Sequence, residues 1–207
     1  MRVVKEAEER RNEILDVAEE LFSSKGFDNT STNDILERVG IARGTLYYHF
    51  KSKEEILDAM IERINNQLIA AASKIASDTS LGVVERIMQS VMALNVDNEL
   101  GHEVMEIAHK PQNALMHQKI QQTLLAGIVP IITRLVEEGI EAKMFDTQYP
   151  EETVEMILLY ANVSFDDLIE QTPEQKLKRV KAFIYNVERL FGMESGALQE
   201  AMMPMFL

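Results

Sequence analysis

The sequence predicts an all-α protein, because its composition favours helices and its apolar residues recur at helical spacing. Leu, Ile, Met, Glu and Ala are abundant over the 207 residues, with only nine glycines, five prolines and no tryptophan. A hydrophobic content of 46% is enough for a substantial core. We expect about nine helices, divided between an N-terminal three-helix domain with a helix-turn-helix (residues 1–53), a C-terminal helical domain (residues 54–192) and a tail (residues 193–207).

The first helix is expected over residues 5–25. It carries one apolar face and is followed by Gly26, which suits a helix stop, and by Phe27, which we expect to enter a small core. The residues that recur on the apolar face are Ile14, Leu15, Ala18, Leu21 and Phe22.

A second helix is expected to begin near Thr32. Ser31 precedes an apolar-periodic segment and has Asp34 three residues later, which is the pattern of a capping box. Gly40 is expected to end this helix, because glycine adopts the left-handed conformation of a helix stop without steric cost. The segment Gly40-Ile41-Ala42 then forms the turn of a helix-turn-helix.

A third helix is expected over residues 43–50, with only Leu46 and Phe50 obliged to face the core. Its other side chains then point outward and have the chemistry of a DNA-reading surface. Gly44 would let the backbone approach a groove, and an arginine can reach a guanine edge or a phosphate. The residues expected to contact DNA are Ser31, Thr32, Arg43, Gly44, Thr45, Tyr47, Tyr48, His49 and Lys53.

The remaining helices are expected over residues 53–77, 82–95, 100–110, 112–138, 151–170 and 174–191. Pro130 should kink the fourth of these, and Gly139 should end it. The last two have strong start signals, Pro150 before two glutamates and Thr172-Pro173-Glu174-Gln175, and both carry wide apolar faces. The Met-rich tail is expected to be disordered or to pack weakly.

The net charge of −13 at first argues against a nucleic-acid partner, since a duplex repels an acidic protein. The charge is unevenly distributed, however. Residues 1–53 hold nine basic against ten acidic residues, whereas residues 54–207 hold 12 against 24. Within residues 31–53 the count is four basic against two acidic, so the expected recognition segment is the locally positive part of an acidic chain.

The segment from Gly26 to Lys53 resembles the DNA-binding domain of the TetR family of transcriptional regulators. The resemblance is carried by Gly26-Phe27, Thr30-Ser31, Asp34-Ile35 and the continuous run Val39-Gly40-Ile41-Ala42-Arg43-Gly44-Thr45-Leu46-Tyr47-Tyr48-His49-Phe50-Lys51-Ser52-Lys53. Ala42 departs from the commonest pattern, in which serine stands at this position. The resemblance implies a repressor that binds a palindromic double-stranded DNA operator as a homodimer, through helices 151–170 and 174–191, and is released by a small-molecule effector.

The resemblance also implies an effector cavity in the second domain, where methionine is frequent and could line adaptable apolar space. Ordinary core packing is the alternative explanation for each methionine. The residues proposed to line such a cavity are Met88, Met92, Asn95, Met105, His109, Met116 and Tyr160.

A metal-sensing regulator is an alternative, because His102, Glu106 and His109 fall on one helical face at i, i+4 and i+7. A helical adaptor that keeps the N-terminal domain but has lost effector binding or DNA specificity is another. We favour neither and expect no metal or other cofactor. No catalytic motif with the required spacing is found, so the chain is not expected to be an enzyme. The absence of cysteine, of an N-terminal signal region and of any membrane-spanning run favours the cytoplasm.

Overall fold

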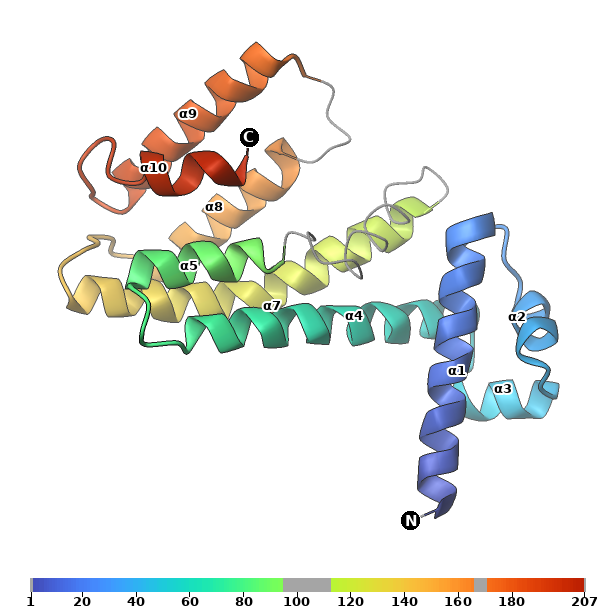
Figure 1. Cartoon of the computed structure of the whole chain (residues 1–207). Helices are drawn as coiled ribbons and strands as arrows, with labels where there is room; N and C mark the ends of the chain where they lie inside the picture. The colour runs from blue at the N-terminus through green and yellow to red at the C-terminus, as the bar shows by residue number, and fades with distance from the viewer. Residues whose placement is uncertain (1, 95–112, 166–170, 207) are drawn as a thin grey trace. The chain divides into compact units, whose positions relative to one another are not determined.

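A computed structural model describes residues 2–94, 113–165 and 171–206, and every regular element in these ranges is helical, as predicted (Figure 1). The first four helices are α1 (Arg2–Lys25), α2 (Thr32–Val39), α3 (Arg43–His49) and α4 (Lys53–Ala76). They are followed by α5 (Val83–Met92), α7 (Ala114–Glu141), α8 (Pro150–Ser164), α9 (Pro173–Leu190), α10 (Gln199–Met202) and a short 3₁₀ turn, η2 (Met203–Met205). The helix expected over 100–110 lies outside the described residues.

The chain forms two compact units. The first contains Met1–Asn66 and Asn98–Gln122, and the second contains Gln67–Asp97 and Thr123–Leu207. The first unit therefore extends beyond the expected boundary at residue 53 and includes the start of α4. Helices α4 and α7 each begin in the first unit and continue into the second.

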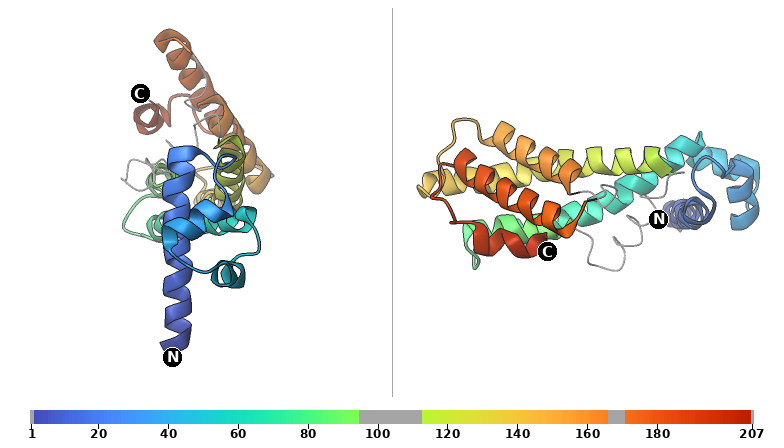
Figure 2. Two further views of the ribbon diagram at one scale, coloured as in Figure 1. Left: turned by 90° about the vertical axis from the view of Figure 1, so that its right-hand side faces the viewer. Right: turned by 90° about the horizontal axis from the view of Figure 1, so that it is seen from above.

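The first unit is built on α1, with α2 and α3 lying beside it (Figures 1 and 2). Phe22 and Phe27 meet edge to face, with ring centroids 5.2 Å apart. Asn113, just before α7, is buried in the same unit and accepts a hydrogen bond from the Phe27 amide at 2.8 Å. The buried apolar core includes Ile14, Leu15, Ala18, Phe22, Phe27, Ile35, Leu46, Phe50, Ile56, Leu57 and Met60.

The second unit surrounds the buried face of α7. Its core joins that face to α4, α8, α9 and α10, and Figure 1 shows α5 beside α7. Thr172 and Gln175 form the expected capping box at the start of α9. The buried core side chains include Ile128, Ile132, Leu135, Val136, Val154, Val180, Phe183, Ile184 and Val187.

One expectation for α7 was wrong, whereas the kink at Pro130 stays a prediction. The helix is continuous from Ala114 to Glu141, with Pro130 inside it. Gly139 lies inside the helix, which ends at Glu141. A Cβ at Gly139 would lie 2.3 Å from the Phe145 ring, so the glycine is needed for close packing and not as a helix stop.

The C-terminal tail was expected to pack weakly, and this was also wrong. Leu198 and Met202 are buried, and α10 packs against both α5 and α9 (Figures 1 and 2). The tail is thus part of the core of the second unit. The sequence obscured this because a four-residue helix is too short to show helical periodicity.

Candidate DNA-binding surface and apolar cavity

The helix-turn-helix begins at the expected capping box. The Ser31 hydroxyl accepts the Asp34 amide at 3.1 Å, and the Asp34 carboxylate accepts the Ser31 amide at 2.7 Å and the Ser31 hydroxyl at 2.6 Å. These bonds, together with the Lys25 ammonium at 2.9 Å, hold the pKa of Asp34 far below its ordinary value. The Ser31 side chain therefore has a structural role at the start of α2.

The turn between α2 and α3 depends on Gly40. Its φ of 74° is left-handed, and its amide donates to Leu36 O at 2.9 Å, which closes α2. A residue with a Cβ would be strained in this conformation, so glycine is required by the backbone. Ala42 then begins α3 without a side-chain cap.

Helix α3 has one buried side and one exposed side. Leu46 is buried against the core, whereas Tyr48 is 79% exposed and Tyr47 is 43% exposed. The guanidinium of Arg43 lies over the Tyr47 ring at 5.7 Å, which holds the two side chains together on the exposed side. An arginine exposed on the second helix of a helix-turn-helix has the chemistry to contact a guanine edge in a major groove.

Gly44 differs from Gly40. It lies within α3, its φ is not positive, and an added Cβ would meet no atom within 4 Å. Neither the backbone nor the packing of the protein requires glycine here, although glycine weakens a helix. A requirement from outside the chain, such as close approach to a duplex, would explain it.

His49 lies between Tyr48 and Phe50, with its ring edge to face on Tyr48 at 5.0 Å. Burial lowers the pKa of His49, and Arg11 and Arg10 lower it further. The imidazole is therefore neutral at neutral pH, so it offers a partner one N–H donor and one nitrogen acceptor.

The lysines that follow α3 have different surroundings. Lys53 donates to Phe27 O at 2.6 Å and lies 4.2 Å from the centre of the Phe27 ring, so its ammonium is occupied within the protein. Lys51 is exposed, and within the described ranges its side chain forms no ion pair. The structure thus offers Lys51 for a phosphate contact where the sequence had suggested Lys53.

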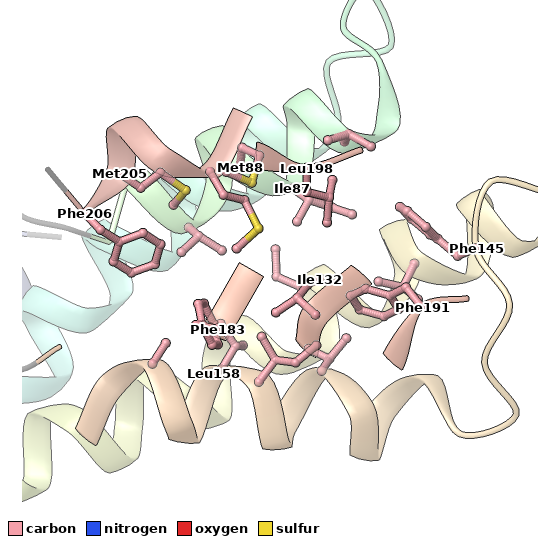
Figure 3. A pocket seen from close by; sticks show the side chains of 18 residues that line it. Ile87, Met88, Ile132, Phe145, Leu158, Phe183, Phe191, Leu198, Met205 and Phe206 are labelled. Atoms are coloured by element: carbon pink, nitrogen blue, oxygen red, sulfur yellow. The ribbon is translucent and has the colours of Figure 1, made fainter. Parts of the chain in front are cut away.

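The second unit contains an apolar cavity of about 90 Å³ (Figure 3). Met205 and Phe206 lie on one side of it in the view, and Phe145 and Phe191 lie on the opposite side. All of its described lining side chains are apolar: Val84, Ile87, Met88, Val91, Ile132, Val136, Phe145, Val154, Ile157, Leu158, Ala161, Phe183, Val187, Phe191, Leu198, Met202, Met205 and Phe206.

Of the four described residues that the sequence suggested for a cavity, one, Met88, lines this one. Met92 is exposed, Met116 is buried in the first unit, and Tyr160 stacks on Phe183 outside the lining. Asn95, Met105 and His109 lie outside the described residues. The contribution of the tail was not predicted, and the apolar run Met202-Met203-Pro204-Met205-Phe206 was the available signal in the sequence.

The metal site suggested by His102, Glu106 and His109 also lies outside the described residues. Among residues that the structure describes, no group of three acidic or histidine side chains has metal-binding geometry. In the same part of the chain, no helix combines the length and apolar character needed to cross a membrane.

These features define a helix-turn-helix protein with a second, helical domain. Residues 14–60 match a family described as "Bacterial regulatory proteins, tetR family", and residues 95–185 match one described as "Tetracyclin repressor-like, C-terminal domain". The chain belongs to the TetR family and is a transcriptional regulator with a helix-turn-helix DNA-binding domain.

Individual relatives agree with this assignment. The transcriptional regulator AcrR of Shigella flexneri is 32% identical over 147 residues, which cover 67% of this chain and 68% of AcrR. The transcriptional repressor KstR2 of Mycobacterium tuberculosis is 29% identical over 146 residues, or 67% of this chain and 72% of KstR2. The fold matches that of RolR, solved with resorcinol, at a TM-score of 0.64 and 15% identity, covering 97% of this chain and 96% of RolR.

Proposed function

We propose that the protein represses transcription as a homodimer on an inverted-repeat operator, and that a small molecule in the apolar cavity weakens this binding. The observation that carries the proposal is the exposed side of α3, where Arg43, Tyr47 and Tyr48 project beside the open Gly44. The protein acts by binding alone, without catalysis. Because operator DNA lies in the bacterial cytoplasm, we place the protein in that compartment.

The residues in and around the helix-turn-helix divide into two roles. Arg43, Thr45 and Tyr48 contact base edges and adjoining phosphates, and neutral His49 adds a hydrogen bond. Lys51 binds a phosphate, whereas Ser31 and Lys53 position the motif through the bonds described above. Thr32, at the first turn of α2, is half-buried and suited to a backbone contact.

Dimerisation through α8 and α9 is supported by an uncovered apolar stripe on α8. Met156, Leu159, Tyr160 and Val163 follow i, i+3, i+4 and i+7 spacing, and all are exposed in the single chain. Contiguous apolar surface of this kind marks an interaction site, and a second copy would cover it symmetrically. Two such protomers would place their α3 helices about 34 Å apart, one turn of DNA.

The dimer is tested by Leu159→Glu, which puts a charge in the centre of the stripe. Sedimentation should show a monomer, whereas Glu155→Gln, at an exposed polar position on the same helix, should leave the dimer intact. A dimer that survives Leu159→Glu unchanged would remove α8 from the interface.

Effector control requires that the ligand bind one conformation of the protein better than another. Helix α4 begins in the DNA-binding unit and continues into the unit that contains the cavity, so it is the element through which we expect the two to be coupled. Such coupling is typically about 1–3 kcal/mol. We do not expect resorcinol, the ligand of RolR, to bind here, because the described lining of this cavity offers no polar group to the resorcinol hydroxyls.

The DNA-binding surface is tested by fluorescence anisotropy on an operator selected from random duplexes. Tyr48→Ala and Thr45→Ala should each weaken specific binding by about tenfold, the loss of roughly 1.4 kcal/mol of contact. Tyr149→Ala is the control, because Tyr149 is also an exposed tyrosine but lies at the start of α8. Unchanged affinity in both α3 variants, with folding intact, would refute the assignment.

A further inference from the structure

The lining of the apolar cavity restricts what can enter it. A buried hydroxyl or amide without a hydrogen-bond partner is costly, and the described lining offers no polar atom. We propose that the cavity binds the apolar body of an uncharged hydrocarbon or aromatic molecule, and that residues 199–206, the end of the C-terminal segment (residues 193–206), are the lid that such a ligand displaces. This proposal rests on the proposed function, in that it names the effector class of the same site.

The size of the cavity supports a moving wall. At about 90 Å³ it is smaller than the roughly 150 Å³ of an engineered cavity that holds benzene. Even a one-ring ligand therefore requires the side chains around it to yield. Met88, Met202 and Met205 are suited to this, because methionine is unbranched and repacks readily.

The C-terminal segment is anchored at its start. The buried carboxylate of Glu188 on α9 accepts hydrogen bonds from the amides of Gly196 at 2.8 Å and Leu198 at 2.9 Å. The Glu188 carbonyl accepts a third from the Met193 amide at 2.8 Å. These bonds fix residues 193–198 to α9.

Beyond Leu198 the segment is held differently. In the described structure its backbone hydrogen bonds are local, such as Met202 N to Leu198 O and Phe206 N to Met203 O. Its attachment to the unit is apolar packing, including Phe206 against Phe165 at 4.5 Å between ring centres. A ligand that replaces these apolar contacts could lift residues 199–206 without breaking a hydrogen bond to the rest of the protein.

The lid forms one side of the cavity wall. Met202, Met205 and Phe206 line the cavity, and Figure 3 shows Met205 and Phe206 together on one side of it. The pivot lies just after Leu198, the last residue whose amide is held by the Glu188 carboxylate.

The ligand class is tested with naphthalene, 1-naphthol and 2,7-dihydroxynaphthalene, which differ in hydroxyl count and little in shape. Probe fluorescence can be followed directly, because the chain contains no tryptophan. We expect naphthalene to bind at one site per chain, with affinity falling about tenfold per hydroxyl. Equal affinity for all three, or no binding of naphthalene, would overturn the proposed class.

The lid is tested with two methionines of η2. Met205 lines the cavity, whereas Met203 is also half-buried, lies two residues away and does not line it. Met205→Ala should tighten binding of the larger probe N-phenyl-1-naphthylamine by about fivefold, and Met203→Ala should leave it within about twofold. Equal effects of the two substitutions would overturn the lid.

Two further arms make the result decisive. Phe206→Ala, at a second lining position of the segment, should act in the same direction as Met205→Ala. All probe titrations are made without DNA, so failure to bind an operator leaves the ligand result intact. Conversely, a protein that binds its operator but not naphthalene retains the DNA-binding function and loses this proposal.

Discussion

Replacing Gly44 with alanine should stabilise the protein while weakening its binding to DNA. The new Cβ would meet no atom within 4 Å, and the residue is helical with no positive φ. Alanine is favoured over glycine by up to about 1 kcal/mol in a helix interior, and less near a helix end. For Gly44, one residue inside α3, we expect about 0.5 kcal/mol, which corresponds to a rise in Tm of about 1–2 °C for a chain of this size.

The same methyl group would stand between α3 and the duplex, so operator affinity should fall by about tenfold, or roughly 1.4 kcal/mol. Thermal melting followed by circular dichroism and fluorescence anisotropy on the operator measure the two effects. Gly82→Ala is the matched control, since Gly82 also stands at a helix start with no atom near its Cβ but lies in the other unit. Wild-type operator affinity in Gly44→Ala would refute close approach of the duplex at Gly44. A lower Tm would show that the new methyl group is not accommodated in open space.

Three other predictions follow from the described contacts. Lys53→Met should lower stability, because it removes the bond to Phe27 O, and should leave the salt dependence of operator binding unchanged. Lys51→Met should leave stability unchanged and reduce the slope of log K against log salt by about one, as measured by titrations at several salt concentrations. The folded-state pKa of Asp34 lies below its ordinary value, so the contribution of Asp34 to stability is present above about pH 4 and is lost as the pH falls further. Ser31→Ala removes a donor to that carboxylate and should flatten this acid dependence. Loss of the Ser31 cap should also lower stability by about 1 kcal/mol, and urea titrations from pH 7 to pH 2 measure both effects. Asn113→Ala leaves the buried Phe27 amide unpaired and should cost about 1–3 kcal/mol in the same assay. Wild-type stability in this variant would show that the hydrogen bond is unimportant.

The helix-turn-helix could be predicted from the sequence because its determinants are local. A capping box, a glycine stop and a pair of core residues four apart all act within one or two turns of helix. Ser31 with Asp34, Gly40, and Leu46 with Phe50 are found in the roles expected of them. The starts of α8 and α9 were predictable for the same reason.

The features that could not be predicted depend on contacts distant in sequence. Lys53 has the sequence context of a free surface lysine, but its ammonium bonds to the carbonyl of Phe27, 26 residues away. Gly139 carried the signal of a helix stop, but it is required by the Phe145 ring. The cavity joins Met88 to Met205 across most of the second unit, and no local pattern in the chain indicates that juxtaposition.

The central claim is that α3 reads a specific, two-fold symmetric DNA site. Its most direct test is to select binding sites for the purified protein from a pool of random duplexes, in parallel with the Tyr48→Ala variant. We expect the wild-type protein to enrich an inverted repeat with half-site centres about one helical turn apart, and the variant to enrich it weakly or not at all. Failure to enrich any motif, or enrichment of the same motif to the same extent by both proteins, would show that α3 does not read the site.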